Sequence, residues 1–245
     1  MYKDKTNEKL KEYYNKFGLM RTLQVAYKML QLPDHKRNKN FKNSVHGELC
    51  ETVLEICIID FMNSHKDETK DWFYSKGLIL KDIESSNSKY LTELDLTLFT
   101  PYKVLTFECK SYGGDKQFID ECTVVRKGIK DSNVYSQHEK HYITLMKNIK
   151  YFRNSDIEFS KIAPLQIGYF DFSLGTVQDN RIKKWRAMMP IINYANISKL
   201  LTSYLNKPEC WNMKMLKQAI DIIDKNKDKN TKKHLTYVKS LHGKN

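Results

Sequence analysis

The 245-residue chain carries 42 Lys and Arg against 29 Asp and Glu, a formal net charge of +13. With 40% hydrophobic and 12% aromatic residues, it is predicted to fold around a sizeable core rather than to stay disordered. The five cysteines include no CxxC pair, and His46 and Cys50 lack a second pair of ligands, so neither a disulfide framework nor a zinc site is indicated. No apolar run is long enough to cross a bilayer. A cytoplasmic protein without a membrane partner is expected.

The positive charge gathers at the two ends of the chain. Residues 1–43 hold 11 Lys and Arg against 4 Asp and Glu, and residues 224–245 hold 7 against 2. The stretch between them is nearly neutral, with 24 against 23. Basic ends around a neutral body favour a polyanionic partner, for which nucleic acid is the usual case. The alternative is that lysine-rich ends serve solubility alone.

The apolar spacing predicts alternating helices and strands. Residues 4–31 are predicted to be helical, broken near Gly18 and ended by Pro33, and a second helix is predicted from an N-cap at Ser44 to about Asn63. Strands are predicted at 78–80, 93–99 and 104–110, then a helix over 132–151 and strands within 162–172 and 188–194. Two more helices are predicted, one to residue 205 and one after Pro208. This order is typical of an α/β core with a mixed β-sheet flanked by helices.

The strands at 93–99 and 104–110 are predicted to pair as a β-hairpin that carries charged side chains. Folding the pair places Asp95 opposite Glu108, and side-chain alternation puts Asp95, Glu108 and Lys110 on one face. The apolar neighbours are expected to face a core: Leu94, Leu96, Leu98, Leu105, Phe107 and Cys109. Cross-strand Cβ atoms lie about 4.5–5.5 Å apart, near enough for two carboxylates to share a divalent cation. The alternative is a surface hairpin with an ordinary Glu–Lys pair.

Two carboxylates and a lysine in this arrangement suit hydrolysis of phosphodiester bonds. Mg²⁺ prefers one or two carboxylates together with water and phosphate oxygens. The Lys110 ammonium group can reach the attacking water or neutralise developing charge. A third acid is expected from the second helix, where Glu48, Glu51 and Glu55 lie along one side. Glu48 is preferred and Glu51 is the reserve, while the alternative for all three is a solvated helix face.

These residues resemble the PD-(D/E)XK nuclease superfamily, and within it the nuclease-related domain (NERD) branch. The resemblance covers about residues 44–205 and rests on Gly47-Glu48, residues 78–83, Glu93-Leu94-Asp95, Phe107-Glu108-Cys109-Lys110 and Gly113-Gly114. Val134-Tyr135-Ser136-Gln137 resembles the start of the helix that carries a Gln in that branch. Leu94 stands where the superfamily name has Pro, and Cys109 where a small or β-branched residue is more frequent.

The resemblance implies a restriction-endonuclease-like core over residues 44–205, with basic helical extensions over 1–43 and 206–245. It implies Mg²⁺ binding by Asp95 and Glu108 with Glu48 as accessory acid, catalysis by Lys110, and a DNA- or site-facing role for Gln137. Mn²⁺ is expected to substitute for Mg²⁺.

Basic residues after the hairpin are candidates for lining a DNA groove: Lys116, Arg126, Lys127 and Lys130. His138 and His141 are expected to be packed or surface residues rather than phosphate ligands. The leading hypothesis is a Mg²⁺-dependent endonuclease acting on DNA rather than RNA, for which a homodimer would suit cleavage of both strands. Two alternatives stay open. One is a nucleic-acid-binding or interaction protein that keeps the fold without cutting, and the other is a nuclease effector of phage or defence biology gated by a partner or ligand.

Overall fold

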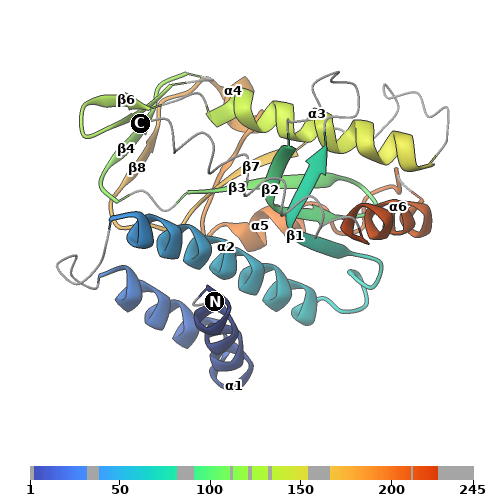
Figure 1. Cartoon of the computed structure of the whole chain (residues 1–245), viewed down its shortest axis with the longest axis horizontal. Coiled ribbons are helices and arrows are strands. Elements are labelled where there is room, and N and C mark those ends of the chain that lie inside the picture. The colour runs from blue at the N-terminus through green and yellow to red at the C-terminus, as the bar shows by residue number, and fades with distance from the viewer. Residues whose placement is uncertain are drawn as a thin grey trace.

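Two β-sheets and the helices around them form the described part of the chain, which in this computed structural model comprises residues 3–31, 39–81, 91–110, 113–120, 123–131, 134–153, 166–210 and 212–225 (Figure 1). The described helices are α1 (Lys3–Leu30), α2 (Lys39–Ser64), α3 (Val134–Arg153), α4 (Lys183–Met188), α5 (Ile197–Thr202) and α6 (Met213–Lys225). The larger sheet contains β1 (Phe73–Lys81), β2 (Leu91–Phe99), β3 (Val104–Lys110), β7 (Gln166–Asp171) and β9 (Ile191–Ile192). The smaller sheet contains β4 (Lys116–Phe118), β5 (Val124–Arg126), β6 (Ile129–Asp131) and β8 (Val177–Asp179).

The larger sheet is mixed, as the sequence predicts. Its strand order is β1-β2-β3-β7-β9, with antiparallel pairing from β1 to β3 and parallel pairing from β3 through β7 to β9. The tight turn between β2 and β3 is closed by Thr100, whose N–H donates to the Lys103 carbonyl at 2.9 Å and whose hydroxyl accepts the Lys103 N–H at 2.8 Å. Because this turn sets the register of the hairpin, it also sets which side chains meet at the far end of β2 and β3.

Helices cover both faces of the larger sheet, so the described part of the chain has an α/β architecture. Figure 1 shows α1 and α2 on one side of the sheet and α3 on the other. The first core cluster joins α1, α2 and α5 to β2, β3 and β7, and the second joins α3 and α6 to β1 and the turn end of the hairpin. The helix predicted after Pro208 is α6, and its buried residues have helical spacing: Leu216, Ala219, Ile220 and Ile223. Within the described ranges, no helix combines the length and apolarity needed to cross a membrane.

The hairpin faces agree with the sequence at most positions, but Leu94 lies on the other side of the sheet. Leu96, Leu98, Leu105, Phe107 and Cys109 pack in the first core cluster, toward α2. Leu94 instead packs in the second cluster, with its β1 partner Leu78. Gly77 precedes Leu78 and has φ 61°, a left-handed conformation that glycine adopts without steric cost. The irregular backbone at Gly77 lies where the alternation of faces along β1 and β2 is interrupted.

The N-terminal helix is part of the core. Gly18 has φ 75° and kinks α1, at the position where the sequence predicts a break. Leu10 lies before the kink and Leu23 after it, and both are buried against α2. The Lys11 ammonium nitrogen also lies 2.5 Å from Glu55 Oε1 of α2. The predicted N-cap at Ser44 is wrong, because α2 begins at Lys39 and no Gly or Pro between Pro33 and Ser44 stops a helix.

The smaller sheet follows the β2–β3 hairpin and was not predicted from the sequence. Its strands are three residues long, and their order is β6-β5-β4-β8. Two loops pass close together at its base, where a Cβ at Gly175 would lie 2.5 Å from the Gly114 carbonyl carbon, and the Gly114 N–H donates to the Leu174 carbonyl at 2.8 Å. Since Gly175 also has φ 116°, only glycine satisfies both constraints there. The segment after β3 is thereby held against the segment after β7.

Candidate active site

Asp95 and Glu108 meet at the end of the β2–β3 hairpin away from its turn. The β2–β3 register runs from Phe99 opposite Val104 to Leu96 opposite Phe107, and the next residues along each strand are Asp95 and Glu108. Asp95 is half-buried, and its Oδ2 accepts the backbone N–H of Cys109 at 2.7 Å. This hydrogen bond joins the two strands and orients the carboxylate beside β3.

The surroundings of Asp95 disfavour the negative charge of its carboxylate. Burial, followed by the negative charges of Glu108 and Glu51, raises the pKa of Asp95 well above its ordinary range. The Cys109 N–H and the Lys110 ammonium group act in the opposite direction and do not outweigh these effects. The folded protein therefore places three acids close enough to repel one another, an arrangement that a proton or a cation would relieve.

Glu108 is the stabilised acid of the pair. Glu108 is only 3% exposed. Its Oε1 accepts a hydrogen bond from the Lys110 ammonium group, and its Oε2 lies 3.3 Å from His138 Nδ1. Burial acts to raise the pKa of Glu108, but the contacts with His138 and Lys110 outweigh it and hold the pKa at about 2. Lys110, two residues along β3, is thus held at the site by the carboxylate that it neutralises.

The glutamate stripe on α2 is divided between the site and the core. Glu51, the reserve candidate, is close enough to Asp95 for its negative charge to raise the pKa of that carboxyl. Glu48 lies one turn earlier on α2 and is half-buried. Glu55 is buried and bound by the ammonium group of Lys11 at 2.5 Å and by the hydroxyl group of Tyr74 at 3.1 Å, which gives it a structural role.

Two histidines of α3 complete the site. His138 is fully buried, and its Nε2 lies 2.9 Å from the Thr106 carbonyl oxygen and 2.8 Å from the Thr106 hydroxyl. His141 is half-buried, and its Nδ1 is buried without a hydrogen-bond partner among the described residues. Ligand atoms of Glu108, His138 and His141 all lie within 4.8 Å of one another.

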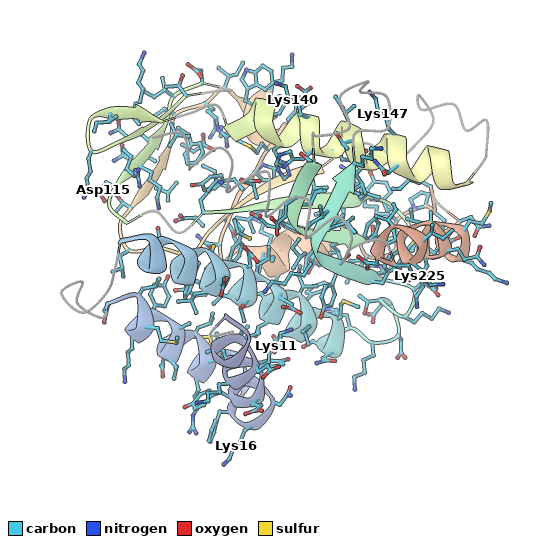
Figure 2. All side chains as sticks on the ribbon, viewed as in Figure 1. Lys11, Lys16, Asp115, Lys140, Lys147 and Lys225 are labelled. Carbon is cyan, nitrogen blue, oxygen red and sulfur yellow. The ribbon has the colours of Figure 1, made fainter. Side chains whose placement is uncertain are left out.

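The orientation of α3 explains this placement. Lys140 and Lys147 lie seven residues apart and point outward from the helix, away from the sheet (Figure 2). His138 and Leu145, also seven residues apart, are fully buried on the opposite side. Packed or surface histidines are predicted from the sequence, and His138 is packed, with Glu108 as its partner. The sequence signal for this cluster was the i, i+3 spacing of His138 and His141, which places both rings on one side of a helix that follows the hairpin.

The predicted DNA-groove residues separate into buried and exposed members. Lys116 is fully buried, with its Nζ 2.7 Å from Asp171 Oδ1 and hydrogen-bonded to Ser173, so its charge is used inside the fold. Lys127 and Lys130 are exposed on the β5–β6 hairpin, and Arg126 is half-buried there. Gln137 belongs to the first turn of α3, and its side chain lies outside the described part of the structure.

Comparisons with protein-family models, with curated proteins and with solved structures found no match. Asp95, Glu108 and Glu51 supply oxygen donors in a buried region, Lys110 supplies a cation, and the two histidines supply nitrogen donors.

Proposed function

We propose that the protein is a Mg²⁺-dependent nuclease that hydrolyses phosphodiester bonds of DNA on a restriction-endonuclease-like core. The observation that carries the proposal is the convergence of Asp95, Glu108 and Glu51 beside Lys110, with the pKa of Asp95 raised by burial and by the other two acids. A fold that keeps like charges together at a cost to its own stability is typical of a functional site. A carboxylate with a purely structural role is more often paired with a cation that lowers its pKa. Glu108 fits that description, and Asp95 does not.

The residues fit a hard divalent cation. Asp95 and Glu108 would hold Mg²⁺, and Glu51 would act as accessory acid, because Mg²⁺ binds carboxylate oxygens and keeps several waters. When bound, the ion supplies charge relief to the phosphate and lowers the pKa of a coordinated water. The like-charge repulsion on Asp95 is the feature of this structure that such an ion would relieve.

Lys110 is the proposed cationic catalytic group. Its Nζ is held by Glu108 Oε1, and its positive charge would offset the negative charge that develops on the phosphoryl oxygens or on the attacking water. The Cys109 N–H orients Asp95 at 2.7 Å, and His138 lies against the other oxygen of Glu108. Each acid is thus positioned by a neighbour in β3 or α3 before any substrate binds.

The charge distribution supports a polyanionic substrate. Residues 1–43 carry an excess of seven positive charges, and the β5–β6 hairpin exposes Lys127 and Lys130. A Cβ at Gly114 would lie 3.3 Å from Lys127 Cε, so Lys127 packs over the turn that follows β3. This contact places an exposed basic hairpin beside the strand that carries the proposed catalytic lysine.

The test is cleavage of supercoiled plasmid and linear duplex DNA with Mg²⁺ or Mn²⁺. Asp95→Asn and Lys110→Ala are expected to lower the rate about 100-fold or more, since each removes a charge that acts on the transition state. Glu93→Gln is the matched control, because it removes an exposed carboxylate from the same strand. Wild-type activity in a folded Asp95→Asn variant would overturn the assignment.

Two further measurements distinguish the accessory acid and separate cleavage from binding. Glu51→Gln is expected to lower cleavage more than Glu48→Gln, because Glu51 is the helix acid that acts on Asp95. DNA binding without turnover, in wild-type protein supplied with either metal, would favour the non-cleaving binding protein instead.

A further inference from the structure

The hydrogen bonds of His138 determine which of its ring nitrogens carries a proton. Nε2 lies 2.9 Å from the Thr106 carbonyl oxygen, which can only accept a hydrogen bond, and 2.8 Å from the Thr106 hydroxyl, which can also accept one, so a proton on Nε2 satisfies both contacts. In a neutral imidazole, Nδ1 then presents a lone pair. That lone pair faces Glu108 Oε2, which is also an acceptor. Two acceptors in this position need a positive charge between them, either a proton or a metal ion.

The separation of the two atoms favours a metal ion. A charge-assisted N–H···O hydrogen bond is usually about 2.7–2.9 Å long, and the Nδ1–Oε2 separation is 3.3 Å. Two ligands at about 2.1 Å from a tetrahedral zinc ion lie about 3.4 Å apart. The Glu108–His138 pair therefore has the spacing of two ligands of one ion.

His141 supplies a third ligand from the next turn of α3. Its Nδ1 is buried without a partner in the described part of the chain, and it belongs to the set of ligand atoms within 4.8 Å of one another. A buried imidazole nitrogen that no hydrogen-bond donor or acceptor satisfies is placed to coordinate a metal ion.

We propose that Glu108, His138 and His141 bind a divalent transition metal of the zinc class, next to the proposed Mg²⁺ position. Two imidazole nitrogens and one carboxylate oxygen suit Zn²⁺ better than Mg²⁺, and three protein ligands leave a fourth position for water. The hydrogen bond from His138 Nε2 to the Thr106 carbonyl is the outer contact that metal-bound histidines usually make. The two sites share Glu108, but zinc-class binding does not depend on nuclease activity.

The experiment measures metal binding directly, without nucleic acid. Chelator-treated protein is titrated with Co²⁺, followed by its visible absorption, and with Zn²⁺, followed by equilibrium dialysis. One ion per chain is expected, and His141→Phe is expected to weaken binding at least tenfold while keeping an aromatic ring in place. His65→Gln is the control, because this histidine bonds to the Phe61 carbonyl at the far end of α2 from Glu51.

The wild-type titration decides the inference even where a variant fails to fold. Failure of wild-type protein to bind one Co²⁺ or Zn²⁺ overturns it and leaves His138 as an imidazolium paired with Glu108. Unchanged binding in folded His141→Phe overturns it as well. Asp95→Asn separates this inference from the proposed function, since it is expected to abolish Mg²⁺-dependent cleavage and to retain Zn²⁺. Zinc binding without any cleavage by wild-type protein would refute the nuclease alone.

Discussion

Glu108→Gln tests whether the charge of the buried acid stabilises the fold. The substitution keeps the shape of the side chain and removes the anion that pairs with Lys110 and His138. The pKa of Glu108 is about 2, against an ordinary value of 4.5. At about 1.4 kcal/mol per pKa unit, the ionised form contributes about 3 kcal/mol to stability at pH 7. The side chain is only 4% exposed, so solvent screening takes little from this figure.

The sign of the pH dependence follows from the lowered pKa. Because the folded state holds Glu108 more acidic than the unfolded state does, this stabilisation is present above about pH 4.5 and is lost as the pH falls toward 2. Urea unfolding of chelator-treated protein measures it. We expect Glu108→Gln to lose about 3 kcal/mol at pH 7, which corresponds to roughly 6–12 °C in Tm for a chain of this length. A loss below about 0.5 kcal/mol, the range of surface substitutions, would refute the reasoning.

Three further substitutions give separate expectations. Asp95→Asn should leave the metal-free protein at least as stable at pH 7, because burial and the neighbouring acids disfavour the charged Asp95; a clear fall in Tm would contradict this. Lys116→Met removes the ion-pair partner of the buried Asp171 carboxylate and should lower the free energy of unfolding in urea by about 3–5 kcal/mol. It should leave the salt dependence of DNA binding unchanged, and a shallower slope would place Lys116 at the DNA interface. Gly168→Ala puts a Cβ 2.7 Å from the Phe107 ring and should cost about 1–3 kcal/mol in the same assay, where wild-type stability would disprove the clash.

The β2–β3 hairpin could be predicted from the sequence because its signal is local. Alternation of apolar and polar residues over 93–99 and 104–110, with Pro101 between them, determines the strands and leaves few registers. Leu94 could not be assigned correctly, since its face depends on Gly77 in the neighbouring strand. The strands at 78–80 and within 162–172 were confirmed as parts of β1 and β7 for the same local reason.

The remaining features depend on packing between distant segments. Glu48 and Glu51 are one turn apart, and only the rotation of α2 against the sheet brings Glu51 to Asp95. The burial of Lys116 depends on Asp171, 55 residues later. The strands of the smaller sheet are three residues long, too short to show a period. The i, i+3 spacing of His138 and His141 marks only the helix part of the remaining cluster, and nothing local in the sequence connects that pair with Glu108, 30 residues before His138.

The burial of α1 has a consequence for dissecting the protein by truncation. The basic segment 1–43 supplies Leu10, Leu23 and Leu30 to the same core that lies under the β2–β3 hairpin. Its removal would uncover that core, so a shortened chain would lose its fold together with its charge. Deletion mapping would then assign to DNA contact what is a loss of structure. Charge-neutralising substitutions on the outer side of α1, such as Lys16→Gln, are the way to separate the two (Figure 2).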